Sequence, residues 1–422
     1  MEKKQIIISG MWEENNTNGV SRYTEMLLDG IPANLYEIIK LEFVHSKNIR
    51  LPKSVKHPKF LEITIPLPID AVEILESDYW RAEYNKVSVH ILEPYLKRNG
   101  IIHIQTTNLI DFAIYLRQLY NYRIVSHIHC IPWKYNYTID RWKFNVIYKK
   151  LNIEGANDGS FIKYFAVKDE YKISQESDAI ICVTNSAKNY YAKYLRVPNS
   201  KLFCIYNGIR DELEDHLNTG NALSSHDDCR KPVRLLFVGG VTREKGFQYI
   251  LEALQIVKAK GYKFELKAAG KIEKEIRSLV ERKYADLDLD FLGVVDYVKL
   301  CSLYRSAQIG LVPSLFEQCS YVALEMSMFG LPVLFSDIDE LHEVFSENKE
   351  MSIPVKFSPH AGLSLDVVTF AGKIMRLIDS RELREQIGRK MRERYVQYFG
   401  LDQMIYKTIG VYNSVFNYEK KS

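Results

Sequence analysis

Several features that mark specialised proteins are scarce in this chain of 422 residues. Its formal net charge is only +4, which argues against a nucleic-acid binder that gains its affinity by neutralising phosphates. No apolar run approaches the ~18 residues of a membrane-spanning helix, so an integral membrane protein is excluded. The apolar stretch near the start, QIIIS, is too short for a signal peptide and is typical of a first strand.

Cysteine motifs are also missing. The six cysteines form no CxxC pair and no metal-binding spacing. Most of them lie in or beside apolar runs, where a free thiol behaves as a small hydrophobic group. This cysteine usage predicts a protein of the reducing cytoplasm.

The composition is that of an ordinary globular protein, with 46% hydrophobic and 26% charged residues. The chain is longer than one hydrophobic core usually supports, so two domains are expected. In both halves, short apolar strands such as RIVSHIH and VRLLFVG alternate with helical patterns. This alternation predicts an α/β fold with two doubly wound, Rossmann-like domains facing a cleft. We expect an N-terminal domain over 1–207, a polar linker over 208–231, a C-terminal domain over 232–400, and a last helix over 401–422 that returns to the first domain.

Ligands of open parallel sheets bind at the carboxyl ends of the strands, so the residues after each strand come next. In VRLLFVGGVTREKG, Gly239 and Gly240 let the backbone approach a ligand, while Arg243 and Lys245 add positive charge before a helix. The segment matches neither GxGxxG nor the P-loop pattern, which weakens dehydrogenase and P-loop interpretations. The alternative for this segment is a basic turn that caps a helix.

The segment IGLVPSLFEQCSYVALEMSMFGLPVLFS combines a buried strand, a polar loop and a helix from about residue 320 to 329. Glu317 lies in the loop and Glu325 in the helix. The backbone between them places several N–H groups at a helix N-terminus, which is an anion site. Other glutamate pairs eight residues apart lie in charged helices and are typical of solvated faces. This pair predicts a diphosphate site with a carboxylate on each side.

At this point the chain resembles the nucleotide-sugar glycosyltransferases of type-B fold, specifically the retaining family four. The resemblance spans nearly the whole chain, through TNGVSRYTEMLLDG, SHIHC, SDAIICVTNSAK and YNGI in the first half. In the second half it rests on FVGGVTREKG, AAGK, FLGVV, LYRSAQIGLVPS, the E-x7-E segment 317–325 and GLPVLFSD.

The resemblance implies a role for each matched residue. Glu317 would contact donor-sugar hydroxyls, Glu325 the ribose, and Lys245 the departing diphosphate. The remaining positions would line the same donor: the backbone of Ser320, Tyr321 and Val322 at the diphosphate, Val294 at the base, Gly19 near the phosphates or acceptor, and His129 facing the sugar from the first domain. His129 would position the substrate without acting as a nucleophile.

Two departures from the family pattern stand out. The family usually has Arg where this chain has Gly240, and Arg243 is the nearest replacement. Gln318, Cys319 and Ser320 replace a glycine-rich turn, which leaves the donor sugar open.

The carboxylate-rich segments DLDLD (286–290) and DID (337–339) are interpreted as a strand entry and a helix cap, so no metal is expected. His103 is interpreted as a satisfied strand residue, and residues 105–108 as contacts for the acceptor. The segment 133–150 concentrates aromatic and basic residues. It fits either a peripheral contact with the inner membrane face or a lipid-linked acceptor, or, as we favour, a helix with its aromatics in the core.

The sequence therefore predicts a retaining, metal-independent glycosyltransferase of the cytoplasm that needs no cofactor. Its donor is a nucleotide-diphosphosugar, with UDP favoured over GDP, and its acceptor is a glycan, a lipid-linked sugar or a peptide. The alternatives are a catalytically silent homologue that binds a partner, or a nucleotide-sugar epimerase on the same fold. The oligomeric state stays open.

Overall fold

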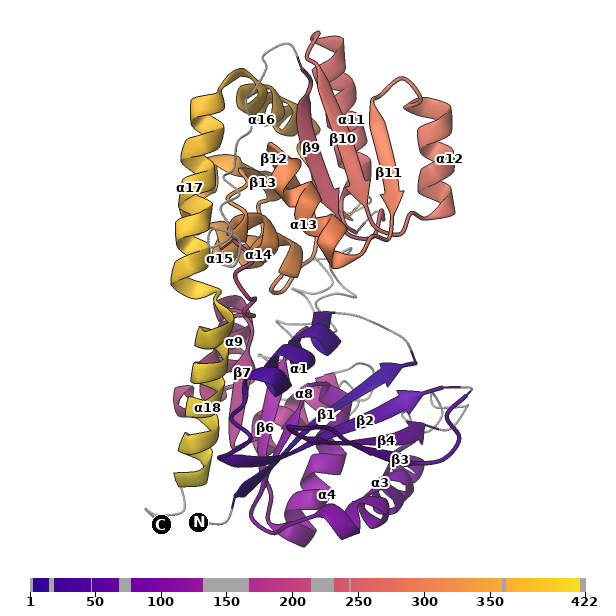
Figure 1. The fold of residues 1–422 in the computed structure, drawn as a ribbon, viewed down its shortest axis with the longest axis vertical. Helices are drawn as coiled ribbons and strands as arrows, with labels where there is room; N and C mark the ends of the chain where they lie inside the picture. The colour runs from indigo at the N-terminus through magenta and orange to yellow at the C-terminus, as the bar shows by residue number, and fades with distance from the viewer. Residues whose placement is uncertain are drawn as a thin grey trace. The chain divides into compact units, whose positions relative to one another are not determined.

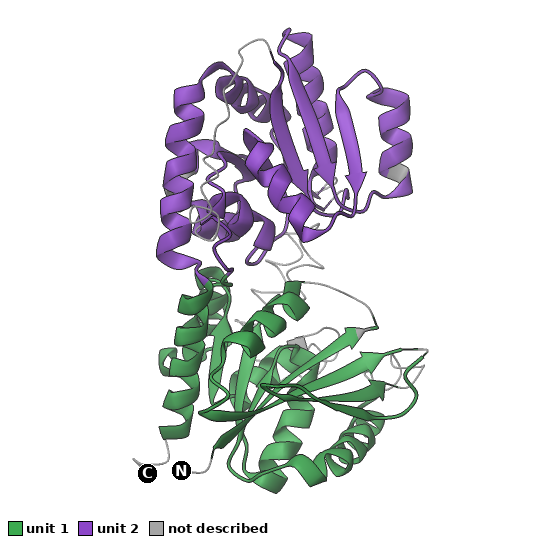
Figure 2. Cartoon of the chain, in the orientation of Figure 1, with its two compact units in different colours: residues 1–133, 151–208, 401–422 green, residues 134–150, 209–400 purple. Residues whose placement is uncertain are grey.

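The computed structural model describes residues 3–14, 19–46, 48–67, 77–131, 167–213, 231–242, 244–358 and 362–417. The chain divides into two compact units, shown in Figure 2. Unit 1 combines Met1–Trp133, Leu151–Gly208 and Leu401–Ser422, and unit 2 contains Ile209–Gly400. Each unit is built on its own parallel sheet, as the alternation of strands and helices predicts.

The sheet of unit 1 has eight strands within the described residues, in the order β3-β4-β2-β1-β5-β6-β7-β8. All neighbours are parallel except β3 and β4. The strands are β1 (Lys4–Glu13), β2 (Tyr36–His45), β3 (Lys53–Lys56), β4 (Leu61–Leu67), β5 (Ile101–Ile104), β6 (Arg123–Ile128), β7 (Ala179–Cys182) and β8 (Leu202–Cys204). The helices are α1 (Gly19–Gly30), α3 (Asp78–Leu92), α4 (Ile110–Tyr120), α8 (Val167–Glu176), α9 (Asn185–Lys193) and α18 (Leu401–Asn417), with 3-10 turns η1 (Glu93–Tyr95), η2 (Thr107–Leu109) and η3 (Asn199–Lys201).

Strand β2 was not predicted from the sequence. Charged residues interrupt its apolar pattern, YEIIKLEFVH. One of them, Lys40, is buried, with its Nζ 2.8 Å from Glu25, 2.9 Å from Glu42 and 3.6 Å from Glu62. Burial alone lowers the pKa of this ammonium, but the hydrogen bonds and charges of Glu25 and Glu42 outweigh it and raise the pKa. A paired lysine thus occupies a core strand that an apolar pattern cannot reveal.

Helix α18 packs within unit 1, although it follows the last helix of unit 2 in the sequence. A Cβ atom on Gly30 would lie 1.8 Å from Cδ1 of Ile405, so the end of α1 and helix α18 are in close contact. Tyr36 donates a hydrogen bond to Asn413 at 2.9 Å, and the Lys4 ammonium lies 4.0 Å from the ring centre of Phe416. The chain's last described helix is therefore part of the first unit's core.

The sheet of unit 2 has six strands among the described residues, all parallel, in the order β11-β10-β9-β12-β13-β14. An antiparallel pair, β15 and β16, stands apart from it. The strands are β9 (Val233–Val238), β10 (Phe264–Ala269), β11 (Leu289–Gly293), β12 (Ile309–Val312), β13 (Val333–Ser336), β14 (Ser352–Ile353), β15 (Val355–Ser358) and β16 (Gly362–Leu365). The helices are α11 (Phe247–Ala259), α12 (Lys274–Lys283), α13 (Tyr297–Ser306), α14 (Tyr321–Met328), α15 (Asp339–Phe345), α16 (Val367–Asp379) and α17 (Arg381–Tyr398), with the 3-10 turn η4 (Ser346–Met351).

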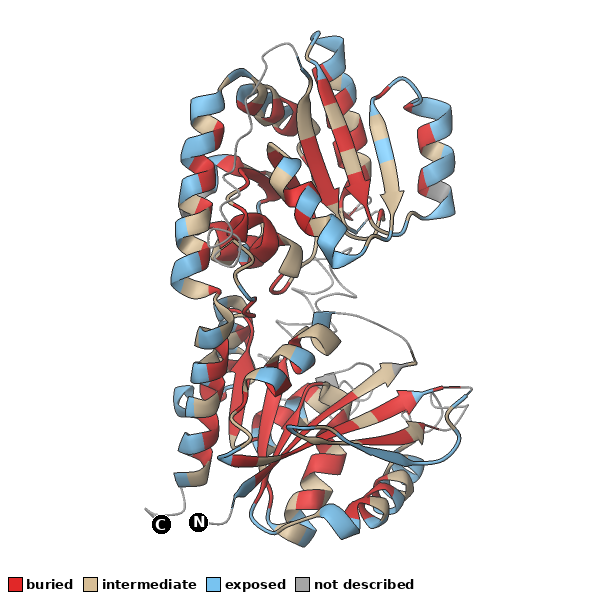
Figure 3. Cartoon of the chain, in the orientation of Figure 1, coloured by how far each residue is buried: buried red, intermediate tan, exposed pale blue. Residues whose placement is uncertain are grey.

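In each unit the central strands are buried and helices cover the sheet, while the edge strands β3 and β11 are more exposed, as Figures 1 and 3 show. Acidic or hydroxyl side chains begin several helices by accepting a backbone hydrogen bond, which is the usual N-cap arrangement. Asp296 caps α13, Asp366 caps α16 and Ser380 caps α17. Helix α17 also approaches the loop after α14, since a Cβ atom on Gly388 would lie 2.1 Å from the carbonyl oxygen of Gly330. This contact fixes α14, which carries predicted site residues.

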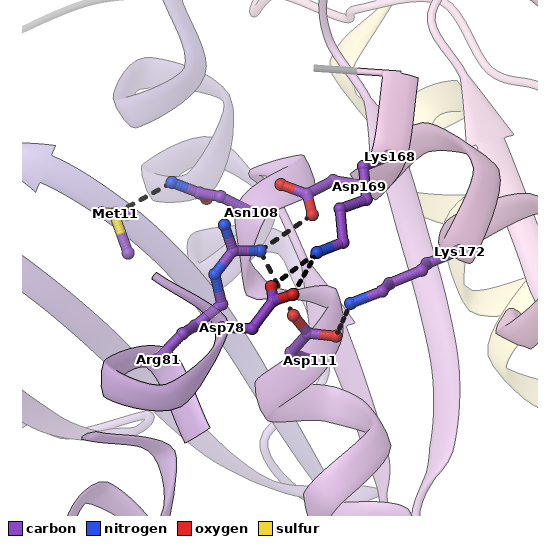
Figure 4. Close-up of polar contacts among 8 residues, drawn as sticks. All are labelled: Met11, Asp78, Arg81, Asn108, Asp111, Lys168, Asp169 and Lys172. Carbon is purple, nitrogen blue, oxygen red and sulfur yellow. Dashed lines mark hydrogen bonds and ion pairs between the residues drawn. The ribbon is translucent and has the colours of Figure 1, made fainter. Parts of the chain in front are cut away.

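An ion network ties together the amino-terminal ends of α3, α4 and α8 in unit 1 (Figure 4). Arg81 lies 3.2 Å from Asp111 and 3.0 Å from Asp169. Lys172 pairs with Asp111 at 2.6 Å, and Lys168 pairs with Asp78 at 2.5 Å. The side chains of Arg81 and Asp169 are only 14% and 15% exposed, so this guanidinium joins three helices in a poorly solvated place.

We expect Arg81→Met to lower the free energy of unfolding of unit 1 by about 2–3 kcal/mol, because it leaves two partly buried carboxylates without their shared cation. Urea unfolding at neutral pH measures this loss. The matched control is Arg381→Met, whose ion pair with Glu385 is half-exposed and should contribute less than about 1 kcal/mol. Equal losses in the two variants would show that the Arg81 network adds nothing beyond a surface pair.

Candidate functional site

Three glycines line the carboxyl edge of the unit 2 sheet, one at the end of each of β9, β10 and β11. Gly239, Gly270 and Gly293 have φ angles of 134°, 143° and 67°, which side chains rarely adopt. A Cβ atom on Gly270 would lie 1.9 Å from the carbonyl oxygen of Gly239, so the first two loops touch through their backbones. The peptide N–H of Gly270 donates to Gly293 at 2.7 Å. The edge is therefore bare backbone, which a ligand can approach closely.

The loop after β9 is joined to the loop after its sheet neighbour β12 by three contacts. The N–H of Leu315 donates to the carbonyl of Glu244 at 2.9 Å. A Cβ atom on Gly246, whose φ is 74°, would lie 2.0 Å from the carbonyl oxygen of Pro313. The ammonium of Lys245 donates to Oε1 of Glu317 at 2.6 Å. Two predicted site residues from different segments thus form one ion pair.

Helix α14 begins directly after this ion pair. Ser320 is its N-cap, and the Ser320 hydroxyl accepts from the N–H of Ala323 at 3.4 Å. Tyr321 and Val322 form the first turn, where backbone N–H groups have no carbonyl partner within the helix. Directly before the helix, Cys319 and Gln318 are buried, and both amide atoms of Gln318 are without a hydrogen-bond partner. A buried, unpaired amide costs free energy that a polar ligand can recover.

Glu325 lies in the second turn of α14 and is only 1% exposed. Its Oε2 accepts a hydrogen bond of 2.6 Å from the hydroxyl of Tyr304, which is itself buried on α13. Sequence reasoning missed Tyr304 as a site residue, although LYRS belongs to the matched segments. Its partner is 21 residues away on another helix, so no local spacing connects the two side chains.

The other residues of unit 2 that are predicted to bind the sugar donor also lie at the carboxyl edge of its sheet. Gly240 follows Gly239 in the β9 loop, and a Cβ atom there would be 3.4 Å from Cγ2 of Thr242, an ordinary contact. Val294 follows β11, two strands away from β9, and is 82% exposed. Arg243 lies outside the described residues, so its position as a replacement for the missing arginine is unassigned.

In unit 1, the predicted residue His129 follows β6 and belongs to a stack of three histidines. The rings of His127 and His129 are parallel within 3° at 4.1 Å, and Tyr23 from α1 meets both rings edge-on. His127 Nδ1 lies 3.2 Å from Nε2 of His103, whose Nδ1 lies 2.7 Å from the hydroxyl of Tyr412 on α18. His103 is thus a bonded strand residue, as expected, but its partner Tyr412 had no signal in the sequence.

Burial lowers the pKa of all three histidines of this stack. It lowers those of His103 and His129 to about 3, and that of His127 well below its usual value. For His127 and His129, the charges that neighbouring rings would carry if protonated add to the effect. The stack is therefore uncharged at neutral pH, and His129 is a poor proton acceptor there.

The structure describes only some of the other residues predicted for the site in unit 1. Gly19 is the first residue of α1 and is exposed, while the residues just before it lie outside the described ranges. The aromatic and basic segment 133–150 lies outside them as well. Among the described residues, no three His, Cys, Asp or Glu side chains are arranged to hold a metal ion, and no helix is long and apolar enough to cross a membrane.

We expect acid to destabilise unit 1 through this histidine stack. The folded pKa values lie below the unfolded value of about 6.5, so stability is complete above that pH and declines as the pH falls from 6.5 towards 3. Urea unfolding between pH 7.5 and 4.5 measures the slope. His103→Gln removes one titrating group and should reduce the slope by about 1.4 kcal/mol per pH unit.

The control for this experiment is His90→Gln, which removes a histidine with an 85% exposed side chain and should leave the slope unchanged. A slope that is the same in wild type and both variants would contradict a neutral buried stack.

Comparison with known proteins agrees with this geometry in both halves of the chain. Residues 17–213 match the family model for Glycosyltransferase Family 4, and residues 226–394 match the model for Glycosyl transferases group 1. An uncharacterised glycosyltransferase of Methanocaldococcus jannaschii is 26% identical over 58% of this chain and 62% of its own length. The chain thus spans less than two thirds of the length of this relative. The O-antigen biosynthesis glycosyltransferase WclY of Escherichia coli is 25% identical over 77% of this chain and 82% of its own length.

Solved structures show the same fold at low identity. The sucrose-phosphate synthase of Thermosynechococcus elongatus has a TM-score of 0.69 at 18% identity, over 98% of this chain and 99% of its own. The UDP-forming α,α-trehalose-phosphate synthase of Burkholderia vietnamiensis has a TM-score of 0.67 at 12% identity, over 98% and 100%. The chain belongs to the glycosyltransferases of GT-B fold, with a Family 4 first half and a group 1 second half.

Proposed function

We propose that this protein transfers a sugar from a UDP-sugar to a hydroxyl of a glycan acceptor, with retention of anomeric configuration and without a metal ion. The observation that carries the proposal is the ion pair of Lys245 and Glu317, 2.6 Å apart beside the N-terminus of α14. The UDP preference is supported by the similar trehalose-phosphate synthase, whose name marks it as UDP-forming. The glycan acceptor is supported by WclY, an O-antigen biosynthesis enzyme.

In this proposal the donor binds along the carboxyl edge of unit 2. The diphosphate accepts hydrogen bonds from the backbone N–H groups of Ser320, Tyr321 and Val322, where the helix dipole favours negative charge. Glu325 binds the ribose through its carboxylate, which Tyr304 holds in place. Glu317 contacts the hydroxyls of the donor sugar. Lys245 exchanges its bond with Glu317 for the diphosphate, because the leaving group gains charge as the glycosidic bond breaks.

The chemical step then depends on fixed charge at the leaving group. Breaking the bond to the diphosphate builds negative charge on phosphate oxygens and positive character on the sugar ring, and preorganised donors stabilise that separation. Attack on the face of the departing phosphate gives retention, and the phosphate accepts the proton of the incoming hydroxyl. A protein general base is then unnecessary, which suits the low pKa of His129.

We expect UDP-glucose or another UDP-sugar to raise the melting temperature of the protein, equally with magnesium and with EDTA. Glu325→Gln should weaken this binding by about tenfold or more, because the amide replaces a buried charged acceptor for the ribose. GDP- and ADP-sugars complete the panel. Glu281→Gln is the control, since Glu281 lies on the outer helix α12, eight residues after another glutamate.

Three outcomes of this panel lead to different conclusions. Binding followed by release of UDP on addition of glycan acceptors supports the transferase. Binding that requires magnesium contradicts the metal-free donor site. No shift with any nucleotide sugar on folded protein overturns the proposal in favour of a silent, partner-binding homologue, and a new nucleotide sugar as product indicates an epimerase.

The absent family arginine gives a second prediction. Position 240 has room for a side chain, so Gly240→Arg should fold and tighten UDP binding by about five- to tenfold through a charge-assisted bond to the diphosphate. Titration calorimetry with UDP measures the change. The matched variant Gly239→Arg places the same charge at a φ of 134° and should lower the melting temperature instead. Unchanged UDP affinity in Gly240→Arg would place the diphosphate elsewhere.

A further inference from the structure

Gln105 is the first residue after β5, at the carboxyl edge of the unit 1 sheet. Its N–H donates to the carbonyl of Ser9 at 2.7 Å, and the residue is only 2% exposed. Its side-chain Oε1 lies 2.7 Å from Nε2 of His129, and its Nε2 is buried without a partner. The side chain of this buried glutamine thus makes its hydrogen bond to the ring of His129, the predicted site histidine.

This contact determines which nitrogen of His129 carries the proton. An amide oxygen only accepts hydrogen bonds, so the ring must donate through an Nε2–H. Burial holds the pKa of His129 at about 3, so the ring carries a single N–H at neutral pH. The second nitrogen, Nδ1, is then a lone-pair acceptor. In the described part of the chain no group pairs with Nδ1, and His129 is half-buried.

The ring also has little freedom to turn. The ring centre of His127 lies 4.1 Å from that of His129 in a stacked arrangement, and the ring centre of Tyr23 lies 4.8 Å away in an edge-on arrangement. His127 is held in turn by His103, and His103 by Tyr412. None of these neighbours carries a charge at neutral pH, because burial lowers the pKa of each histidine and raises that of both tyrosines. The neighbouring rings therefore fix the plane of the His129 ring, and Gln105 keeps its proton on Nε2.

We propose that Gln105 is a positioning residue that holds His129 in the Nε2–H tautomer, so that Nδ1 accepts a hydrogen bond from a substrate hydroxyl. The part about the substrate rests on the proposed function, while the tautomer is a property of the free protein. His129 then recognises a hydroxyl as a neutral acceptor and transfers no proton. An anionic group at the same place finds a lone pair and no donor, so this position favours uncharged, hydroxyl-rich substrates.

The tautomer is tested on the full chain without substrate, by long-range ¹H–¹⁵N correlation spectra of protein labelled at histidine. The spectrum of His129→Gln identifies the His129 signals. We expect Nε2 of wild-type His129 to be protonated and Nδ1 to be unprotonated from pH 6 to 8. Gln105→Met removes the acceptor and should give a mixture of tautomers or the Nδ1–H form. An Nδ1–H form in wild type, or an unchanged Nε2–H form in Gln105→Met, overturns the proposal.

Gln105→Glu separates positioning from folding, because it keeps an acceptor at the same distance and adds a negative charge. It should retain the Nε2–H bond and raise the pKa of His129 into the range that the NMR titration covers. Unaltered His103 signals in each variant show that the stack is folded. A Gln105→Glu variant whose His129 titrates as in wild type would show that the two side chains are not in contact, and would overturn the proposal.

The consequence for catalysis is measured with the donor and acceptor that the transfer assay identifies. Gln105→Met should raise KM for the donor, whose sugar the family resemblance places at His129, more than it lowers kcat, and Gln105→Glu should introduce a pH dependence near neutrality that wild type lacks. A loss confined to kcat, with KM unchanged, contradicts recognition of a hydroxyl by Nδ1. If wild type transfers no sugar at all, the proposed function fails, whereas the tautomer is still decided by the spectra.

Discussion

In a parallel sheet every strand ends on the same edge, and two pairs of predicted site residues in this protein meet because of that constraint. The loops after β9 and β12 meet because their strands are neighbours, which brings Lys245 to Glu317 although 72 residues separate them. The same geometry places Gln105 beside His129, since β5 and β6 are neighbours in the other sheet. Glycines with positive φ angles then let these loops touch through bare backbone.

The Lys245 ion pair of unit 2 and the histidine stack of unit 1 differ in their electrostatics. The edge of unit 2 holds an ammonium, two carboxylates and a helix N-terminus, which suits a charged diphosphate linked to hydroxyl-rich groups. The histidine stack of unit 1 holds neutral imidazoles beside an amide, because burial lowers the pKa of the histidines. Charge is thus present at the ion pair beside α14, whereas the three stacked histidine rings are neutral.

Unit 1 also holds a charged network around Arg81, which joins α3, α4 and α8 (Figure 4). There and at Lys40, carboxylates from several elements surround one cation. Such pairs offset the cost of burying charge without adding much net stability, whereas removing one partner leaves an uncompensated charge.

The sequence by itself determined the α/β class, the repetition of the fold in two halves, and the segments at the carboxyl ends of the strands. It could do so because apolar strands, glycine turns and helix starts are local patterns. Lys245, Glu317 and Glu325 were predicted as site residues from such segments, and their roles remain predictions. Gly240 was recognised as a departure, but only the structure showed that a side chain has room there.

The tertiary structure alone decided which distant groups meet. Tyr412 reaches His103 across 309 residues because α18 packs in unit 1, and no spacing in the sequence encodes that contact. Tyr304 beside Glu325, Gln105 beside His129, and the charged strand β2 were hidden for the same reason. Hydrogen bonds and ion pairs between separate elements are set by the packing of whole helices and strands, whereas a sequence pattern reports only what each element does along its own length.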